Sequence, residues 1–104
     1  MKIAWTDEAV ESLAALHDYI AHDSPTYADR FVERLLAAVD QLETFPDLGR
    51  HVPEAPVEVP GIREVLFHTY RVIYRREAER VLILTVLHGS RNLAGQEPKP
   101  WELT

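Results

Sequence analysis

The chain has 104 residues, of which 46% are hydrophobic, which is enough for one domain with a modest core. It contains no cysteine, so disulfides and thiolate metal sites are excluded. The apolar segment after Met1 and Lys2 is too short for a signal peptide or a membrane span, and we therefore expect a cytoplasmic protein without membrane contact.

The net charge of −6 is unevenly distributed along the chain. Residues 1–60 carry four basic and twelve acidic side chains, a net −8, whereas residues 61–104 carry seven basic and five acidic side chains, a net +2. An acidic chain lacks the positive charge that supplies most of the free energy of nonspecific nucleic-acid binding, so we expect no direct binding of DNA. Nucleic-acid contact through a local arginine patch in the second half of the chain is left as an alternative.

The first half predicts two helices. Ile3–Trp5 reads as a short strand, after which Thr6 is a competent N-cap for a helix that ends near Asp23. Ser24 and Pro25 form a second start signal, because proline at the first helical position loses no hydrogen bond. The second helix has a broad apolar stripe consisting of Ala28, Phe31, Val32, Leu35, Leu36, Val39 and Leu42. The short connection predicts an antiparallel helical hairpin.

Three segments with a strand period follow, at residues 62–68, 70–75 and 81–86. The connections His68–Thr69 and Glu77–Arg80 allow only hairpins, so the three strands should pair antiparallel in chain order. The third segment is apolar on both faces except at Thr85, which predicts a strand at the centre of the sheet.

The remaining segments lack a period. Residues 51–61 contain three prolines and read as an extended surface loop. Residues 92–104 read as a loosely ordered C-terminal tail, whose Trp101 is a candidate to dock on the domain. The predicted fold is α+β, with a short N-terminal strand, an antiparallel helical hairpin and a three-stranded antiparallel meander. The helices pack on one face of the sheet, and the other face is partly open. One core should contain Leu13, Leu16, Ile20, Phe31, Leu35, Val39, Leu82, Leu84 and Val86.

Four segments, in order and with matching gaps, resemble the signatures of the RelE/ParE superfamily of bacterial toxins. They are Phe45–Arg50, Gly61–Glu64, Tyr70–Arg75 and Val81–Gly89. The resemblance covers nearly the whole chain and implies that residues 1–104 form a single RelE/ParE-like domain. It also implies the toxin of a type II toxin-antitoxin pair, kept silent by an antitoxin protein made from the same operon.

The RelE-like branch of this superfamily cleaves messenger RNA on the ribosome, a reaction that needs a base, an acid and cations around the reacting phosphate. By position in the motifs, the resemblance would make Arg63 and Arg71 the phosphate clamps. His88 would be the acid or base, and Arg91 an auxiliary cation. The ordinary structural alternatives are an ion pair between Arg71 and Glu64 and a hydrogen-bonded His88.

The ParE-like branch inhibits DNA gyrase through protein contacts and needs no catalytic set. The acidic charge favours this branch, as does the glycine that follows His88, where RNA-cleaving members usually have a tyrosine. Our interpretation is therefore a gyrase-inhibiting toxin that is not an enzyme. A ribosome-dependent messenger RNA endoribonuclease and an antitoxin-binding domain without toxicity remain the alternatives.

Candidate contact residues follow from residue type and exposure. Val32, Leu36 and Phe67 are predicted to bind the antitoxin, because apolar patches left uncovered usually mark a protein interface. Trp101 and Arg91 are predicted to bind the target, since tryptophan and arginine dominate interfaces. The histidines are scattered without a paired carboxylate at ligand spacing, so we predict no metal site and no cofactor.

Overall fold

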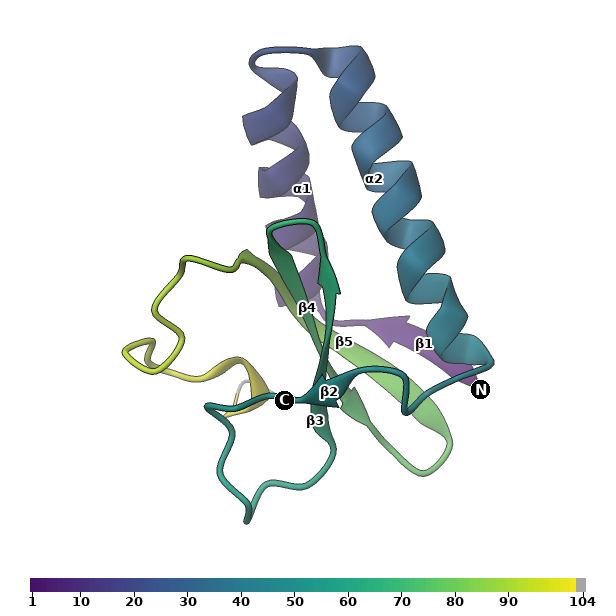
Figure 1. Ribbon diagram of the computed structural model, residues 1–104, viewed down its shortest axis with the longest axis vertical. Coiled ribbons are helices and arrows are strands. Elements are labelled where there is room, and N and C mark those ends of the chain that lie inside the picture. The colour runs from purple at the N-terminus through teal and green to yellow at the C-terminus, as the bar shows by residue number, and fades with distance from the viewer. Residues whose placement is uncertain (103–104) are drawn as a thin grey trace.

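The computed structural model describes residues 1–102, so residues 103 and 104 of the predicted tail lie outside the described residues. Its elements are β1 (Lys2–Trp5), α1 (Asp7–Ala21), α2 (Pro25–Asp40), a 3-10 turn at Gln41–Glu43, β2 (Arg50–His51), β3 (Ile62–Phe67), β4 (Tyr70–Arg76), β5 (Arg80–His88) and a second 3-10 turn at Pro100–Glu102. The two helices stand side by side and project beyond the strands (Figure 1). The predicted α+β class and element order are confirmed, and β2 is an addition that the sequence pattern placed in a turn and loop.

Both helices begin where the capping residues predicted. The Thr6 hydroxyl accepts a hydrogen bond from the Ala9 amide (3.0 Å) and donates to the Ile83 carbonyl (3.1 Å), which ties the start of α1 to the sheet. Ser12 strengthens this link, because its hydroxyl accepts from the Val86 amide (2.9 Å). These bonds fix α1 along β5. The side chains of α1 therefore keep a fixed position relative to those at the end of β5.

The sheet has five strands in the order β1-β5-β4-β3-β2, with β1 parallel to β5 and the other pairs antiparallel. The predicted meander is confirmed, and β5 is buried on both faces. Its predicted place at the centre of the sheet is wrong, because β2 extends the other side and leaves β4 in the middle. The β3–β4 turn lacks glycine, and His68 adopts a left-handed φ of 54° there.

A bulge in β5 decides which side chains face the helices. Ile73 pairs with Thr85 and Tyr74 with Ile83, so Leu84 is an extra residue opposite β4. Ile83 and Val86 consequently both face the helices, although they are three residues apart. Leu84 belongs to a core on the opposite face of the sheet.

The sheet therefore has a core on each face, whereas one core was predicted. The helix-side core consists of Ala9, Leu16, Phe31, Leu35, Val39, Leu42, Val72, Tyr74, Val81, Ile83 and Val86. The other core consists of Val52, Ile62, Ile73, Leu82, Leu84, Leu87, Leu93 and Trp101. The prediction of a partly open second face is wrong, because the 52–60 loop and the C-terminal tail cover it. Burying a large apolar side chain there contributes about 1.5 to 3 kcal/mol, which is the physical reason for the closure.

The tail is docked over its described part, in contrast to the predicted loose attachment. Leu93 and Trp101 are 1% and 4% exposed, and Arg75 donates to the Trp101 carbonyl (2.7 Å). The Lys99 ammonium organises the preceding loop by donating to the carbonyls of Ala94 (2.6 Å) and Gln96 (2.7 Å). Within residues 1–102, no helix has the length and apolar character needed to cross a membrane.

Candidate functional site

The four candidate catalytic residues do not converge on one place. Arg63 pairs with Tyr74 and His88 pairs with Tyr70, and both tyrosines pack in or against the helix-side core. Arg71 alternates with them along β4 and points to the opposite face of the sheet. Tyr74 and Tyr70 are about 13 Å apart along the strand at the usual rise per residue. Arg63 and His88 are therefore separated along the sheet, and Arg71 projects from the face opposite to both.

Arg71 is held by two carboxylates. Its Nε lies 2.6 Å from Glu64 Oε1, and its two terminal nitrogens lie 2.8 and 3.1 Å from the two oxygens of Glu54. The Glu64 side chain is fully buried and also accepts from Arg50 Nε (2.7 Å). These two arginines and two glutamates have no net formal charge. The sequence alternative of an Arg71–Glu64 ion pair is confirmed, although the pair is buried.

The pKa shifts in this network follow from the same bonds. The hydrogen bond from Arg71 is the main cause that lowers the pKa of Glu54, and partial burial opposes it. The bond to Glu54 is likewise the main cause that raises the pKa of Arg71. Both groups are thus fixed in their charged forms at neutral pH. Glu54 lies in the proline-rich loop, where sequence periodicity gave no signal for its partner.

Arg63 has a structural set of contacts. It donates to the Gly49 carbonyl (2.6 Å) and forms an ion pair with Asp47 (3.7 Å). Tyr74 supports the same turn, because its hydroxyl donates to the Pro46 carbonyl (2.8 Å) and accepts from the Gly49 amide (3.0 Å). Burial raises the pKa of this fully enclosed tyrosine. The Phe45–Arg50 motif thus fixes the chain entering the sheet, a role that the sequence did not assign to Tyr74.

His88 is exposed at the end of β5. The Ser90 amide donates to its Nδ1 (3.1 Å), and the Ser90 hydroxyl is 2.7 Å from the same atom. Because Nδ1 accepts, the neutral ring carries its proton on Nε2. The ring also meets Tyr70 edge-on, with the centroids 5.1 Å apart. Within the described residues His88 forms no ion pair.

Two surface cavities flank the Tyr70–His88 pair. The first has a volume of about 460 Å³, and Arg50, Glu54, Arg71 and His88 are among its lining residues. The second, of about 730 Å³, lies between α1 and the end of β5, and Arg91 contributes to its lining. Arg71 and His88 thus line the same cavity from opposite faces of the sheet. The terminal nitrogens of Arg71 are already hydrogen-bonded to the Glu54 carboxylate.

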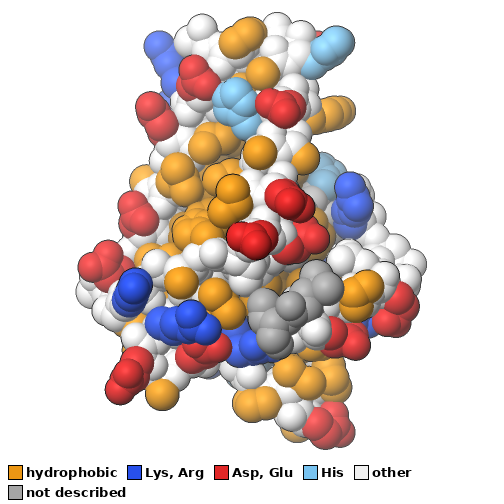
Figure 2. All heavy atoms as spheres, turned by 180° about the vertical axis from the view of Figure 1, so that it is seen from behind, with side chains coloured by type: hydrophobic (Ala, Val, Ile, Leu, Met, Phe, Trp, Pro, Cys, Tyr) orange, Lys and Arg blue, Asp and Glu red, His pale blue; other side chains and the backbone are white. Residues whose placement is uncertain are grey.

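The predicted antitoxin-binding residues lie on the helix-side layer. Leu36 is 36% exposed, and Val32, one turn earlier on α2, is half-buried. Phe67 packs its ring against Phe31, with the centroids 5.2 Å apart, and is also half-buried. Hydrophobic side chains gather over the helical layer on the face seen from behind (Figure 2). The assignment of these three residues to an antitoxin interface stays a prediction.

Trp101 and Arg91, the predicted target contacts, differ in accessibility. Trp101 is buried in the second core, so its prediction as a surface contact is wrong for the described chain. The physical reason is that the large indole removes more apolar area from water by docking on the sheet. Arg91 is exposed and forms no ion pair within residues 1–102. It remains available for contact with a partner.

Nearly the whole chain matches one family of known proteins. Residues 3–93 match the family described as the ParE toxin of type II toxin-antitoxin system, parDE. The chain belongs to the ParE toxin family. The resemblance to the RelE/ParE superfamily is therefore confirmed, and with it the assignment as a toxin of a type II toxin-antitoxin system.

Individual relatives of this ParE-family chain span almost its full length. Toxin RelE2 of Caulobacter vibrioides is 41% identical over 91 residues, which cover 86% of this chain and 97% of that protein. Toxin ParE3 of the same organism is 32% identical over 79 residues, covering 76% of each chain. A chain in the structure of the chromosomal ParDE TA system from P. aeruginosa has a TM-score of 0.69 and 25% identity, covering 85% of this chain and 95% of that one. Relatives with both names match, so these similarities do not separate the two branches of the superfamily.

Proposed function

We propose that this ParE-family toxin inhibits DNA gyrase through protein contacts and does not cleave RNA. The observation that supports this is the neutralised guanidinium of Arg71, whose three contacts to Glu54 and Glu64 measure 2.6 to 3.1 Å. A phosphate would have to displace one carboxylate and approach the other, which costs free energy. Cleavage also needs an acid, a base and cations around one phosphate, and Arg63 does not line the cavity that Arg71 and His88 share.

RNA cleavage is the second candidate. It is favoured by the cavity that Arg71 and His88 share, and by the similarity to a protein named toxin RelE2. If Glu54 swung away with its loop, Arg71 would gain a free guanidinium edge beside that cavity. A third candidate, an antitoxin-binding domain without toxicity, predicts that neither gyrase nor messenger RNA is affected.

We further propose that a cognate antitoxin holds the toxin inactive in the cytoplasm, where gyrase acts. The similar chain from P. aeruginosa belongs to a ParDE TA system, which supports a partner of this kind. The net −8 of residues 1–60 would attract a basic segment, and Val32, Leu36 and Phe67 would receive its apolar side chains. Arg91 would remain a contact with gyrase.

Two assays run in parallel test the proposed target. The purified chain is added to a DNA gyrase supercoiling reaction and, separately, to a translating extract whose messenger RNA is mapped by primer extension. We expect loss of supercoiling with intact message, and restoration of supercoiling when the antitoxin is added first. Defined cuts in the message with unaffected supercoiling would support the RelE-like activity. No effect in either assay would support the domain without toxicity.

A further inference from the structure

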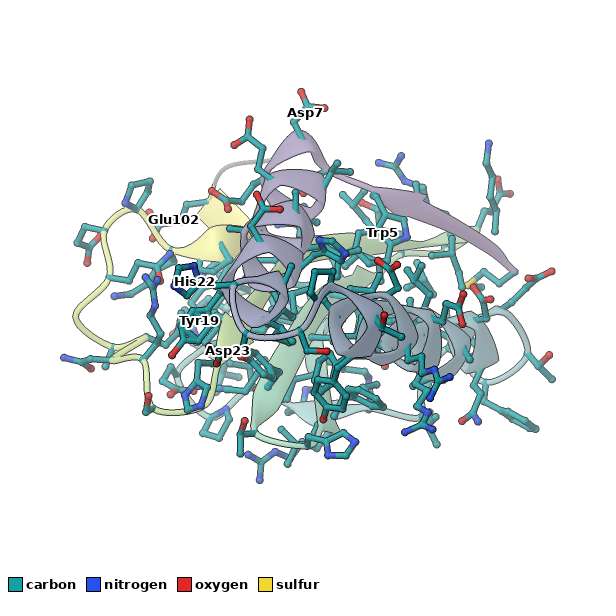
Figure 3. The ribbon with its side chains drawn as sticks, turned by 90° about the horizontal axis from the view of Figure 1, so that it is seen from above. Trp5, Asp7, Tyr19, His22, Asp23 and Glu102 are labelled. Atoms are coloured by element: carbon teal, nitrogen blue, oxygen red, sulfur yellow. The ribbon has the colours of Figure 1, made fainter. Side chains whose placement is uncertain are left out.

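The larger of the two surface cavities forms a groove away from the Arg71 network. It has a volume of about 730 Å³, with Glu8, Glu11 and Tyr19 of α1 on one side. Tyr70 and the segment that follows β5 line the other side. Tyr19 lies on the flank of α1 that faces the C-terminal tail, away from α2 (Figure 3). The groove is therefore formed by elements that the Thr6 and Ser12 hydrogen bonds hold in place.

The acidic side chains in this groove form no ion pairs among the described residues. Helix α1 carries four acidic residues and no Lys or Arg, and neither Glu8 nor Glu11 forms an ion pair within residues 1–102. Glu8 lies in the first turn, where a negative charge is stabilised by the helix dipole. Glu11 lies beyond that turn, where the helix dipole stabilises a negative charge much less. A cation that entered the groove would meet two uncompensated carboxylates.

Two tyrosine rings, those of Tyr19 and Tyr70, also line the groove. Tyr19 is 73% exposed, so the face of its ring is accessible to a ligand. Tyr70 is packed edge-on against His88 and Phe31, with centroids 5.1 and 5.7 Å away. Burial is the main cause that raises the pKa of Tyr70, and the charge of Tyr19 contributes less. Tyrosine rings beside carboxylates suit a guanidinium or ammonium group.

Other ligand classes fit this groove poorly. An apolar side chain would remove water from Glu8 and Glu11 without replacing it by a partner, and an anion would be repelled by both. Arg91 also lines the groove and would repel a cation at its own end. The most favourable position for an incoming cation is therefore beside α1.

We infer that this groove binds a Lys or Arg side chain of the antitoxin, with Glu8 and Glu11 as its counter-charges and Tyr19 as its aromatic contact. The inference rests on the antitoxin partner proposed above and names one place where that partner attaches. The occupant is a basic residue flanked by small or apolar ones, because Ala15 and Leu16 of α1 line the same groove. It gives the acidic half of the chain a specific role in recognition.

Charge reversal tests this inference. The double variant Glu8→Lys with Glu11→Lys is compared with Glu58→Lys and Glu79→Lys, which changes the net charge equally at two exposed acidic residues outside the groove. Affinity for the co-encoded antitoxin is measured by titration calorimetry at low and at high salt. We expect the groove variant to bind about tenfold or more weakly at low salt, with a smaller loss at high salt, and the control to change less than about threefold.

Three further variants separate binding from folding. Lysine near a helix N-terminus lowers stability slightly, so the milder Glu8→Gln with Glu11→Gln is measured as well, with thermal unfolding of each variant. Tyr19→Ala should weaken binding, whereas Tyr19→Phe should retain it, since the ring face is kept. A Lys or Arg of the antitoxin whose change to Glu restores binding to the Glu8→Lys and Glu11→Lys variant would identify the occupant.

The outcomes distinguish the inference from the proposed function. Equal losses for the groove and control variants would mean that only the overall charge matters, and this would overturn the inference while leaving the antitoxin partner intact. Full affinity for the groove variants would overturn it in the same way. If the wild-type chain failed to bind the antitoxin at all, the proposed partner and the inference would both be wrong.

Discussion

Replacing Arg71 with alanine should destabilise the fold far more than loss of a surface charge. The Glu64 side chain is fully buried and would keep only Arg50, whose side chain is 60% exposed. Breaking a buried ion pair by removing one partner costs about 3 to 5 kcal/mol. Glu54, whose side chain is 26% exposed, adds little because water can replace its partner. At the usual sensitivity of a domain of this size, the melting temperature should fall by about 12 °C or more.

Urea unfolding followed by the fluorescence of Trp5 and Trp101 measures this cost at neutral pH. The matched control is Arg91→Ala, because Arg91 is exposed and has no ion pair within residues 1–102, and its effect should stay within about 0.5 kcal/mol. A loss below about 1 kcal/mol for Arg71→Ala would refute the reasoning, because that is the value of an exposed ion pair. Arg71 would then be solvated and available for phosphate.

Three other predictions concern stability. The hydrogen bond to Asp29 raises the pKa of His17 from 6.5, so its stabilisation is present below that pH and is lost as pH rises through the folded value. The difference in unfolding free energy between wild type and His17→Ala should therefore be larger at about pH 5.5 than at about pH 8.5. These pH values lie roughly one unit below and two units above the unperturbed pKa, and a pH-independent difference would contradict the prediction. Gly49→Ala would place a Cβ 2.6 Å from the Glu64 carbonyl and should cost about 1 to 3 kcal/mol in urea unfolding, whereas an unchanged midpoint would mean that the turn relaxes freely. Trp101→Ala should cost about 3 to 5 kcal/mol, and a loss near zero would mean that the tail is not docked in solution.

Local signals were sufficient to predict the helices and the meander. Thr6 and Ser24 are N-caps whose side-chain bonds depend only on the residues that follow them, and the short connections left hairpins as the one arrangement. The second core was missed because its cover has no period. Prolines in the 52–60 loop and the tail suggested exposure, yet Val52, Leu93 and Trp101 lie on the sheet. The bulge at Leu84, which turns Val86 toward the helices, has no sequence marker.

The candidate site was harder to predict from the sequence. Alternation along β4 correctly separates Arg71 from Tyr70 and Tyr74, but the partner of Arg71 depends on where an aperiodic loop places Glu54. The motif residues therefore indicated the family. That two glutamates neutralise Arg71 became clear only from the three-dimensional structure. The groove beside α1 was also missed, because α1, the end of β5 and the segment after it meet only in the folded chain.

The supercoiling assay with wild type and His88→Ala tests the central claim most directly. His88 is exposed, and in the described chain its ring hydrogen-bonds to Ser90 and packs against Tyr70, so its replacement by alanine should leave the fold intact. The proposed function predicts that both proteins inhibit gyrase at similar concentrations while messenger RNA stays whole. Messages cut at defined positions by the wild type and left intact by His88→Ala, with normal supercoiling in both, would contradict it.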